Sequence, residues 1–148
     1  DGNNVANSII LCGSLLGAEI RIACPKGYEP DPSIIEKATS INHKTNKLII
    51  TDDINDAVSG ANVLYTDVWS SMGEEKNKEI KDKDFKGFTL DKSLVSKAQK
   101  DAIVMHCLPA YRGKEIMDEI IESKRSRVFQ QAENRMHAQQ ALLACLLQ

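Results

Sequence analysis

The stretch NVLYTDVWSSMG, residues 62–73, decides the fold class because a short apolar, β-branched run passes directly into polar residues. Residues 62–66 predict a buried β-strand, and Asp67 follows at its carboxyl end. The stretch AIVMHCLPA, residues 102–110, repeats the pattern: residues 102–106 predict a strand, and Cys107 opens the loop after it. Two such strands with helical patterns between them are typical of an α/β protein with a parallel sheet.

The rest of the chain continues this alternation. Further strands are predicted at residues 19–24, 47–51, 88–90 and 127–129. Helices are predicted at residues 5–16, 31–43, 53–60, 74–83, 91–99, 114–122 and 133–147, with Asp31, Asp53 and Asp91 as N-caps. The fold class is therefore α/β, with a doubly wound, mostly parallel sheet flanked by helices, Rossmann-like. Because a strand ordinarily precedes a loop such as DGNN at residues 1–4, we expect the first strand of the sheet to be missing from the chain.

Composition favours one globular domain over residues 1–148, with 42% hydrophobic and 27% charged residues. A net charge of -2 argues against a nucleic-acid partner. The apolar runs are far shorter than the roughly 20 residues that cross a membrane. The four cysteines form no CxxC pattern and no signal peptide is recognisable. We therefore expect a cytoplasmic protein, or one of the mitochondrial matrix if the source is eukaryotic.

Taken singly, the polar residues after the strands have ordinary structural explanations. Asn3 and Asn4 are at even odds of being helix caps, and Asp67 suits a turn. Cys107 alone is best explained as a small buried hydrophobe, and His106 as a hydrogen-bonded structural histidine rather than a metal ligand. Trp69 and Met72 are typical of core packing and gap filling. No single residue therefore assigns a function.

The combination is more specific. DGNN at residues 1–4, DVWSSMG at 67–73, HCLP at 106–109 and AENR at 132–135 occur in this order, with PKGYEPD at 25–31 between them. Together they resemble the carboxyl-terminal domain of ornithine carbamoyltransferases over essentially the whole chain. The resemblance implies transfer of the carbamoyl group of carbamoyl phosphate to the δ-amine of L-ornithine, giving L-citrulline and phosphate. It implies no metal and no organic cofactor.

The resemblance also implies a role for each motif residue. Asp67 pairs with the α-ammonium of ornithine and Asn4 hydrogen-bonds its α-carboxyl end, where Ser71 and Met72 close over it. Cys107 lies beside the reacting amine, either as proton acceptor or as an orienting contact, and not as a covalent nucleophile. Carbamoyl phosphate is held by Cys107, the backbone of Leu108 and Arg135. A cis peptide bond between Leu108 and Pro109 is expected in this loop.

Other functions fit these motifs less well. Aspartate carbamoyltransferases usually carry a proline where Cys107 stands, and a putrescine enzyme has no need of the SMG element, so ornithine is favoured among the amines. A noncatalytic amino-acid-binding module would not need HCLP and AENR. A dinucleotide-binding domain would need more than the one glycine of DGNN.

The resemblance covers only one half of the family's enzymes. The phosphate-binding motifs Ser-Thr-Arg-Thr-Arg and His-Pro-x-Gln belong to the amino-terminal, carbamoyl-phosphate-binding half and do not occur here. We therefore expect that domain of the same enzyme as a partner and a homotrimer when complete, acting in arginine biosynthesis or, in reverse, in arginine breakdown. The chain on its own is expected to be inactive.

Overall fold

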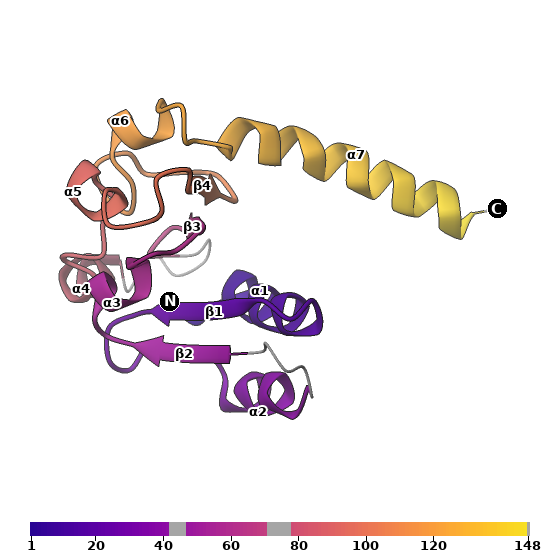
Figure 1. The fold of residues 1–148 in the computed structure, drawn as a ribbon, viewed down its shortest axis with the longest axis horizontal. Helices are drawn as coiled ribbons and strands as arrows, with labels where there is room; N and C mark the ends of the chain where they lie inside the picture. Colours follow the sequence, from indigo (N-terminus) through magenta and orange to yellow (C-terminus); the bar gives the residue numbers. More distant parts are fainter. Residues whose placement is uncertain (42–46, 71–77, 148) are drawn as a thin grey trace. The chain divides into compact units, whose positions relative to one another are not determined.

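The computed structural model describes residues 1–41, 47–70 and 78–147. Its contacts divide the chain into two compact units. The first unit comprises Asp1–Ser59 and Trp69–Phe88, and the second comprises Gly60–Val68 and Thr89–Gln148. Each unit contains a parallel pair of strands together with helices (Figure 1). The chain is therefore an α/β protein, as its sequence predicts.

The first unit is built around strands β1 (Glu19–Ala23) and β2 (Lys47–Thr51), which pair in parallel from Glu19 opposite Lys47 to Ala23 opposite Thr51. Its helices are α1 (Asn4–Leu15), α2 (Pro32–Ser40), α3 (Ile54–Val58) and α4 (Lys78–Asp84). The core joins α1, β1 and α2 through Ile10, Ile20 and Ala38. The helix start predicted at Asp31 is confirmed, because its side chain accepts a 2.7 Å hydrogen bond from the Ser33 amide.

The second unit is built around strands β3 (Val63–Thr66) and β4 (Ile103–His106), which also pair in parallel, from Val63 opposite Ile103 to Thr66 opposite His106. Its helices are α5 (Lys92–Val95), α6 (Asp118–Ile121) and α7 (Val128–Leu146). The interior of this unit contains Leu64, Val104, Ile116, Ile120 and Val128. Both strands that the opening motifs predict are therefore present and adjacent.

The carboxyl-terminal part of the second unit differs from the sequence prediction. The strand predicted at residues 127–129 is wrong, because α7 already begins at Val128 and only a single bridge joins Ser126 to Val104. The helix predicted at residues 114–122 shortens to α6, because Ile116 is held in bridges to Leu90 and Arg112. At Ile116, tertiary pairing overrides local helix propensity.

Helix α7 is a long element of 19 residues (Figure 1). The leucines at its carboxyl end, Leu142, Leu143 and Leu146, are exposed, as is Leu147, which follows the helix. Even so, none of the helices among residues 1–41, 47–70 and 78–147 has the length and apolar character needed to cross a bilayer.

Candidate active site

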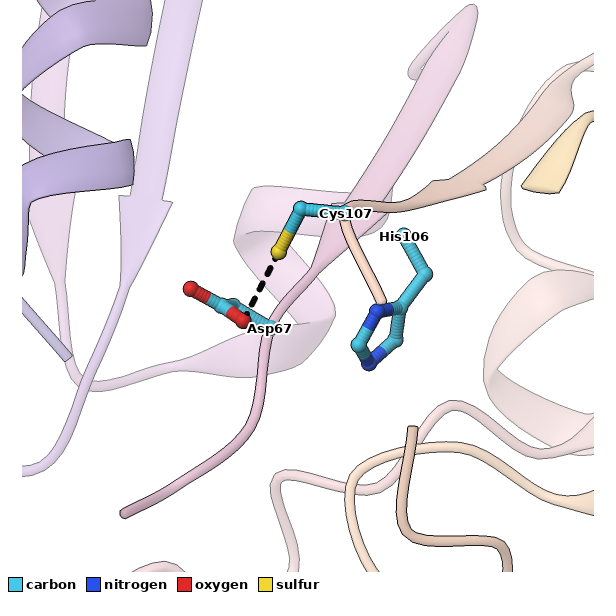
Figure 2. Close-up of side chains that lie close together, drawn as sticks. All are labelled: Asp67, His106 and Cys107. Atoms are coloured by element: carbon cyan, nitrogen blue, oxygen red, sulfur yellow. Dashed lines mark hydrogen bonds between the residues drawn. The ribbon is translucent and has the colours of Figure 1, made fainter. Parts of the chain in front are cut away.

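The ends of β3 and β4 bring two of the predicted site residues together. Because the strands are parallel and in register, the residues that follow them leave the sheet at the same edge. The Cys107 thiol donates a hydrogen bond of 2.9 Å to Oδ1 of Asp67 (Figure 2). The same Oδ1 accepts the Val68 amide at 2.7 Å, which fixes the carboxylate at the strand end. Asp67 and Cys107, which follow two different strands, are therefore in direct contact.

The protonation state of Cys107 follows from its surroundings. Burial of the side chain, together with the hydrogen bond to Asp67 and the negative charge of that carboxylate, raises the pKa of the thiol to about 12. Cys107 is therefore a neutral thiol at neutral pH, whose proton points to the carboxylate. This arrangement favours an orienting contact over a thiolate that would accept a proton.

Two polar residues complete this cluster and were not assigned a role from the sequence. The Gln131 amide Nε2 donates to the Tyr65 hydroxyl at 2.9 Å, while its Oε1 accepts the backbone N–H of His106 at 3.1 Å. The pKa of Tyr65 is raised to about 12, first by burial and then by the neighbouring Cys107. Gln131 thus links α7 to the ends of both strands.

A signal for each of these two residues is present in the sequence. Tyr65 lies on β3, and Asp67 follows two positions later, just after the strand. Because side chains alternate between the two faces of a strand, a spacing of two predicts that both point to the same face. Gln131 directly precedes the AENR motif.

His106 is a hydrogen-bonded histidine, as the sequence predicts. Its ring is fully buried. Figure 2 shows the ring directed away from the Cys107 thiol, which points to Asp67. Ring Nδ1 accepts the Leu108 amide at 2.9 Å, and ring Nε2 lies 3.1 Å from Glu115 Oε1.

Asp67, His106 and Cys107 each offer one potential metal-ligand atom, and these atoms lie within 4.8 Å of one another. A metal ion there would have to displace hydrogen bonds that all three side chains already make. The residues present therefore fit a hydrogen-bonded cluster better than a metal site.

The loop after β4 has the backbone geometry expected from HCLP. The peptide bond between Leu108 and Pro109 is cis, as predicted. Leu108 has φ of 59°, in the left-handed region that side chains other than glycine seldom occupy. The backbone of this loop is therefore held in an uncommon conformation directly beside Cys107.

The remaining predicted residues lie elsewhere in the chain. Asn4 is the first residue of α1 in the first unit and is exposed, whereas Asn3 is the N-cap of that helix. Ser71 and Met72 lie outside the described residues. Arg135 is exposed on α7, and it lies well inside the helix rather than at its start, because α7 begins at Val128. The structure thus gathers Asp67, Cys107 and Leu108.

Comparison with known sequences identifies the family. The family model described as "Aspartate/ornithine carbamoyltransferase, Asp/Orn binding domain" matches residues 1–146. The ornithine carbamoyltransferase of Prochlorococcus marinus strain MIT 9312 is 71% identical over 147 residues, which cover 99% of this chain and 48% of that protein. The ornithine carbamoyltransferase of Nostoc sp. strain PCC 7120 is 50% identical, with the same shares covered.

Solved structures agree with this match. The anabolic ornithine carbamoyltransferase from Campylobacter jejuni superposes with a TM-score of 0.92 at 44% identity, covering 99% of this chain and 48% of that one. The enzyme from Pyrococcus furiosus gives a TM-score of 0.90 at 47% identity, covering 97% and 46%. The chain spans about half the length of the curated relatives it matches. The chain therefore belongs to the aspartate/ornithine carbamoyltransferase family, of which it is the Asp/Orn-binding domain.

Proposed function

We propose that this chain is the ornithine-binding half of an ornithine carbamoyltransferase, which converts L-ornithine and carbamoyl phosphate to L-citrulline and phosphate. The observation that carries the proposal is the contact between the Cys107 thiol and the Asp67 carboxylate at adjacent strand ends, in a chain of this family. In the reaction the δ-amine nitrogen bonds to the carbamoyl carbon. The C–O bond to phosphate breaks, and the leaving phosphate takes the electron pair and the proton that the amine nitrogen loses.

The amine has to be neutral to attack. An alkyl ammonium has a pKa of about 10.4, so deprotonating it at pH 7 costs about 4.6 kcal/mol, at about 1.36 kcal/mol per unit. The half-buried Asp67 carboxylate offers a partner for the ammonium before the proton leaves. The Cys107 proton is directed to Asp67, so its sulfur lone pairs are available to an amine N–H. Cys107 then orients the nitrogen for attack.

The resemblance to the family supplies the other contacts of ornithine. Asp67 pairs with the α-ammonium, Asn4 binds the α-carboxyl end, and Ser71 and Met72 close over it. The contact of Asp67 with Cys107 supports a further role for its carboxylate beside the reacting amine. Fixing both ends of a flexible substrate selects the near-attack geometry, which is worth roughly 7 to 11 kcal/mol of the barrier.

Carbamoyl phosphate is assigned to Cys107, the Leu108 backbone and Arg135. Arg135 lies four residues after Gln131, so the two side chains share one face of α7. The hydrogen bonds of Gln131 to Tyr65 and to the His106 amide place that face toward the strand ends. This geometry supports a role for the Arg135 guanidinium as a partner of the phosphate group.

The finer features of the family belong to the same proposal. We infer that residues 1–148 form one domain with a doubly wound, Rossmann-like sheet whose first strand is missing from this chain. Support comes from the family model, which spans both units, and from the parallel pairing within each. The amino-terminal, carbamoyl-phosphate-binding domain of the same enzyme is then the partner, and the complete enzyme is a homotrimer by resemblance. Four free cysteines suit a reducing, cytoplasmic compartment.

A transferase for another amine is the first competing function. Acetylornithine transcarbamylase superposes with a TM-score of 0.82 at 27% identity, so the same fold accepts a modified ornithine. A noncatalytic ornithine-binding module is the second. It would keep the pocket but has no use for a thiol held against a carboxylate at the reacting end.

The deciding experiment measures carbamoylation by the complete gene product, with carbamoyl phosphate and ornithine, N-acetylornithine, putrescine or aspartate offered separately. Citrulline formation with ornithine alone is expected. Product from one of the other amines would reassign the substrate. Ornithine binding without any product would favour the noncatalytic module.

A further inference from the structure

A buried pair of ionisable residues lies behind the Cys107 loop and has no role in the chemistry described so far. His106 is the last residue of β4, and Glu115 lies in the turn that precedes α6. Both residues have 0% exposure. Burying a histidine and a carboxylate is costly unless they are hydrogen-bonded to one another or to the backbone. The hydrogen bonds of His106 and Glu115 therefore indicate the role of the pair.

The hydrogen bonds define the tautomer of His106. Its Nδ1 accepts the Leu108 amide at 2.9 Å, so Nδ1 carries no proton. The ring proton is then on Nε2, which donates to Glu115 Oε1 at 3.1 Å. Both ring nitrogens are occupied, so His106 is not available as an acid or base for substrate.

Glu115 connects the ring to the far side of the loop. Its Oε1 accepts the Tyr111 amide at 2.6 Å in addition to the bond from His106. The pair thus ties the backbone at Leu108 and Tyr111 to the end of β4. Cys107 lies inside this tied segment, and its neighbour Leu108 has a φ of 59°. A loop in an uncommon backbone conformation keeps it only when its surroundings determine it.

The second oxygen of Glu115 is an independent sign of a functional constraint. Glu115 Oε2 is buried and has no hydrogen-bond partner among residues 1–41, 47–70 and 78–147. A buried carboxylate with one oxygen atom that accepts no hydrogen bond lowers the stability of the folded state. Stability alone therefore does not explain a glutamate at this position. An apolar side chain would fill the space, but it could not accept from two donors at once.

We propose that His106 and Glu115 are positioning residues for carbamoyl transfer, holding Cys107 and Leu108 through the neutral, Nε2-protonated form of His106. The inference rests on the proposed function for its link to turnover. The geometry of the Cys107 loop and the tautomer of the His106 ring can be tested independently of the proposed function.

The kinetic test uses the complete enzyme and compares variants of Glu115. Glu115→Ala removes the oxygen that accepts from both His106 and the Tyr111 amide. We expect kcat to fall about 10²-fold, because the Cys107 loop shifts. The KM for ornithine should change little, because the residues proposed to bind the α-amino and α-carboxyl groups do not shift. Glu115→Gln keeps an oxygen for both donors and should recover most of kcat. The matched control is Glu119→Ala. Glu119 lies on α6, and its exposed carboxylate pairs with Lys92. Full kcat in a folded Glu115→Ala enzyme would refute the proposal.

Two variants of His106 separate its two bonds. The amide oxygen of His106→Asn replaces Nδ1 and keeps the acceptor for Leu108. The amide nitrogen of His106→Gln replaces Nε2 and keeps the donor to Glu115. Because Leu108 adjoins Cys107, we expect the Gln variant to lose more of kcat than the Asn variant. Equal losses in folded proteins would contradict the tether to Leu108.

Two further readouts do not depend on activity. Nitrogen chemical shifts of ¹⁵N-histidine-labelled enzyme should give an unprotonated Nδ1 and a protonated Nε2 for His106. Alkylation of Cys107 should be several-fold faster in Glu115→Ala than in wild type. The opposite tautomer, or an unchanged alkylation rate, would refute the positioning pair. A wild-type enzyme that carbamoylates no amine, yet has this tautomer and labelling change, would refute only the proposed function.

Discussion

Cys107 is the residue at which surroundings change chemistry most. A free cysteine has a pKa near 9, and in this fold burial and the Asp67 carboxylate raise the pKa to about 12. A raised pKa means that the folded state prefers the thiol. Its contribution to stability is therefore complete below pH 9 and is lost as the pH rises from about 9 to about 12.

The same shift predicts a slow thiol. We expect iodoacetamide labelling of Cys107, followed by peptide mass spectrometry, to stay slow through pH 9 and to accelerate toward pH 12. Asp67→Asn removes the carboxylate charge and should move the acceleration to lower pH. Cys24 is the internal control, since burial is the largest cause of its raised pKa and Asp67 is not among the causes. Fast labelling of Cys107 at pH 8 would contradict the thiol assignment.

Asp67 is predicted to affect turnover as well as binding. In the complete enzyme Asp67→Ala should lower kcat by about 10²-fold and raise KM for ornithine, because the carboxylate accepts the hydrogen bond from the Cys107 thiol and is proposed to pair with the substrate. Steady-state kinetics with ornithine varied at saturating carbamoyl phosphate measures the two effects separately. Unchanged kcat would show that Asp67 only binds.

At the scale of elements, helix α1 places two adjacent asparagines in different structural positions. The Asn3 side chain accepts the Val5 and Ala6 amides at 3.0 Å each and caps the helix. Asn4 is the first helical residue and is exposed. The even odds assigned to capping are therefore resolved in favour of a cap for Asn3, and Asn4 keeps its predicted role with ornithine.

These neighbours form a matched pair for mutation. Asn3→Ala should destabilise the chain by about 1 kcal/mol, through loss of the cap. Asn4→Ala should leave thermal unfolding nearly unchanged but raise KM for ornithine in the complete enzyme. Thermal unfolding of the chain and enzyme kinetics measure the two effects. A loss of stability in Asn4→Ala equal to that in Asn3→Ala would assign both residues to capping.

At the scale of the whole molecule, the chain matches only about half of its relatives' length. The Ser-Thr-Arg-Thr-Arg and His-Pro-x-Gln motifs expected to hold phosphate do not occur among its 148 residues. Near-attack geometry requires both substrates to be held at once.

We therefore expect no citrulline from the 148-residue chain with ornithine and carbamoyl phosphate, under conditions in which the complete gene product is active. Ornithine binding by the chain, measured by calorimetry, is the control for folding. Turnover by the chain alone would contradict the division of labour between the two halves.

The sequence by itself determined the α/β class, the strands at the opening motifs and the Asp31 cap, because each depends on local rules of burial and capping. The cis bond before Pro109 is expected from the family resemblance of the HCLP motif. The parallel pairing of β3 with β4 in the structure brings Asp67 beside Cys107. Only the tertiary structure decided the direction of the Cys107 proton and the buried pair of His106 and Glu115. Those features depend on the desolvation of particular atoms and on partners distant in sequence, which no local pattern specifies.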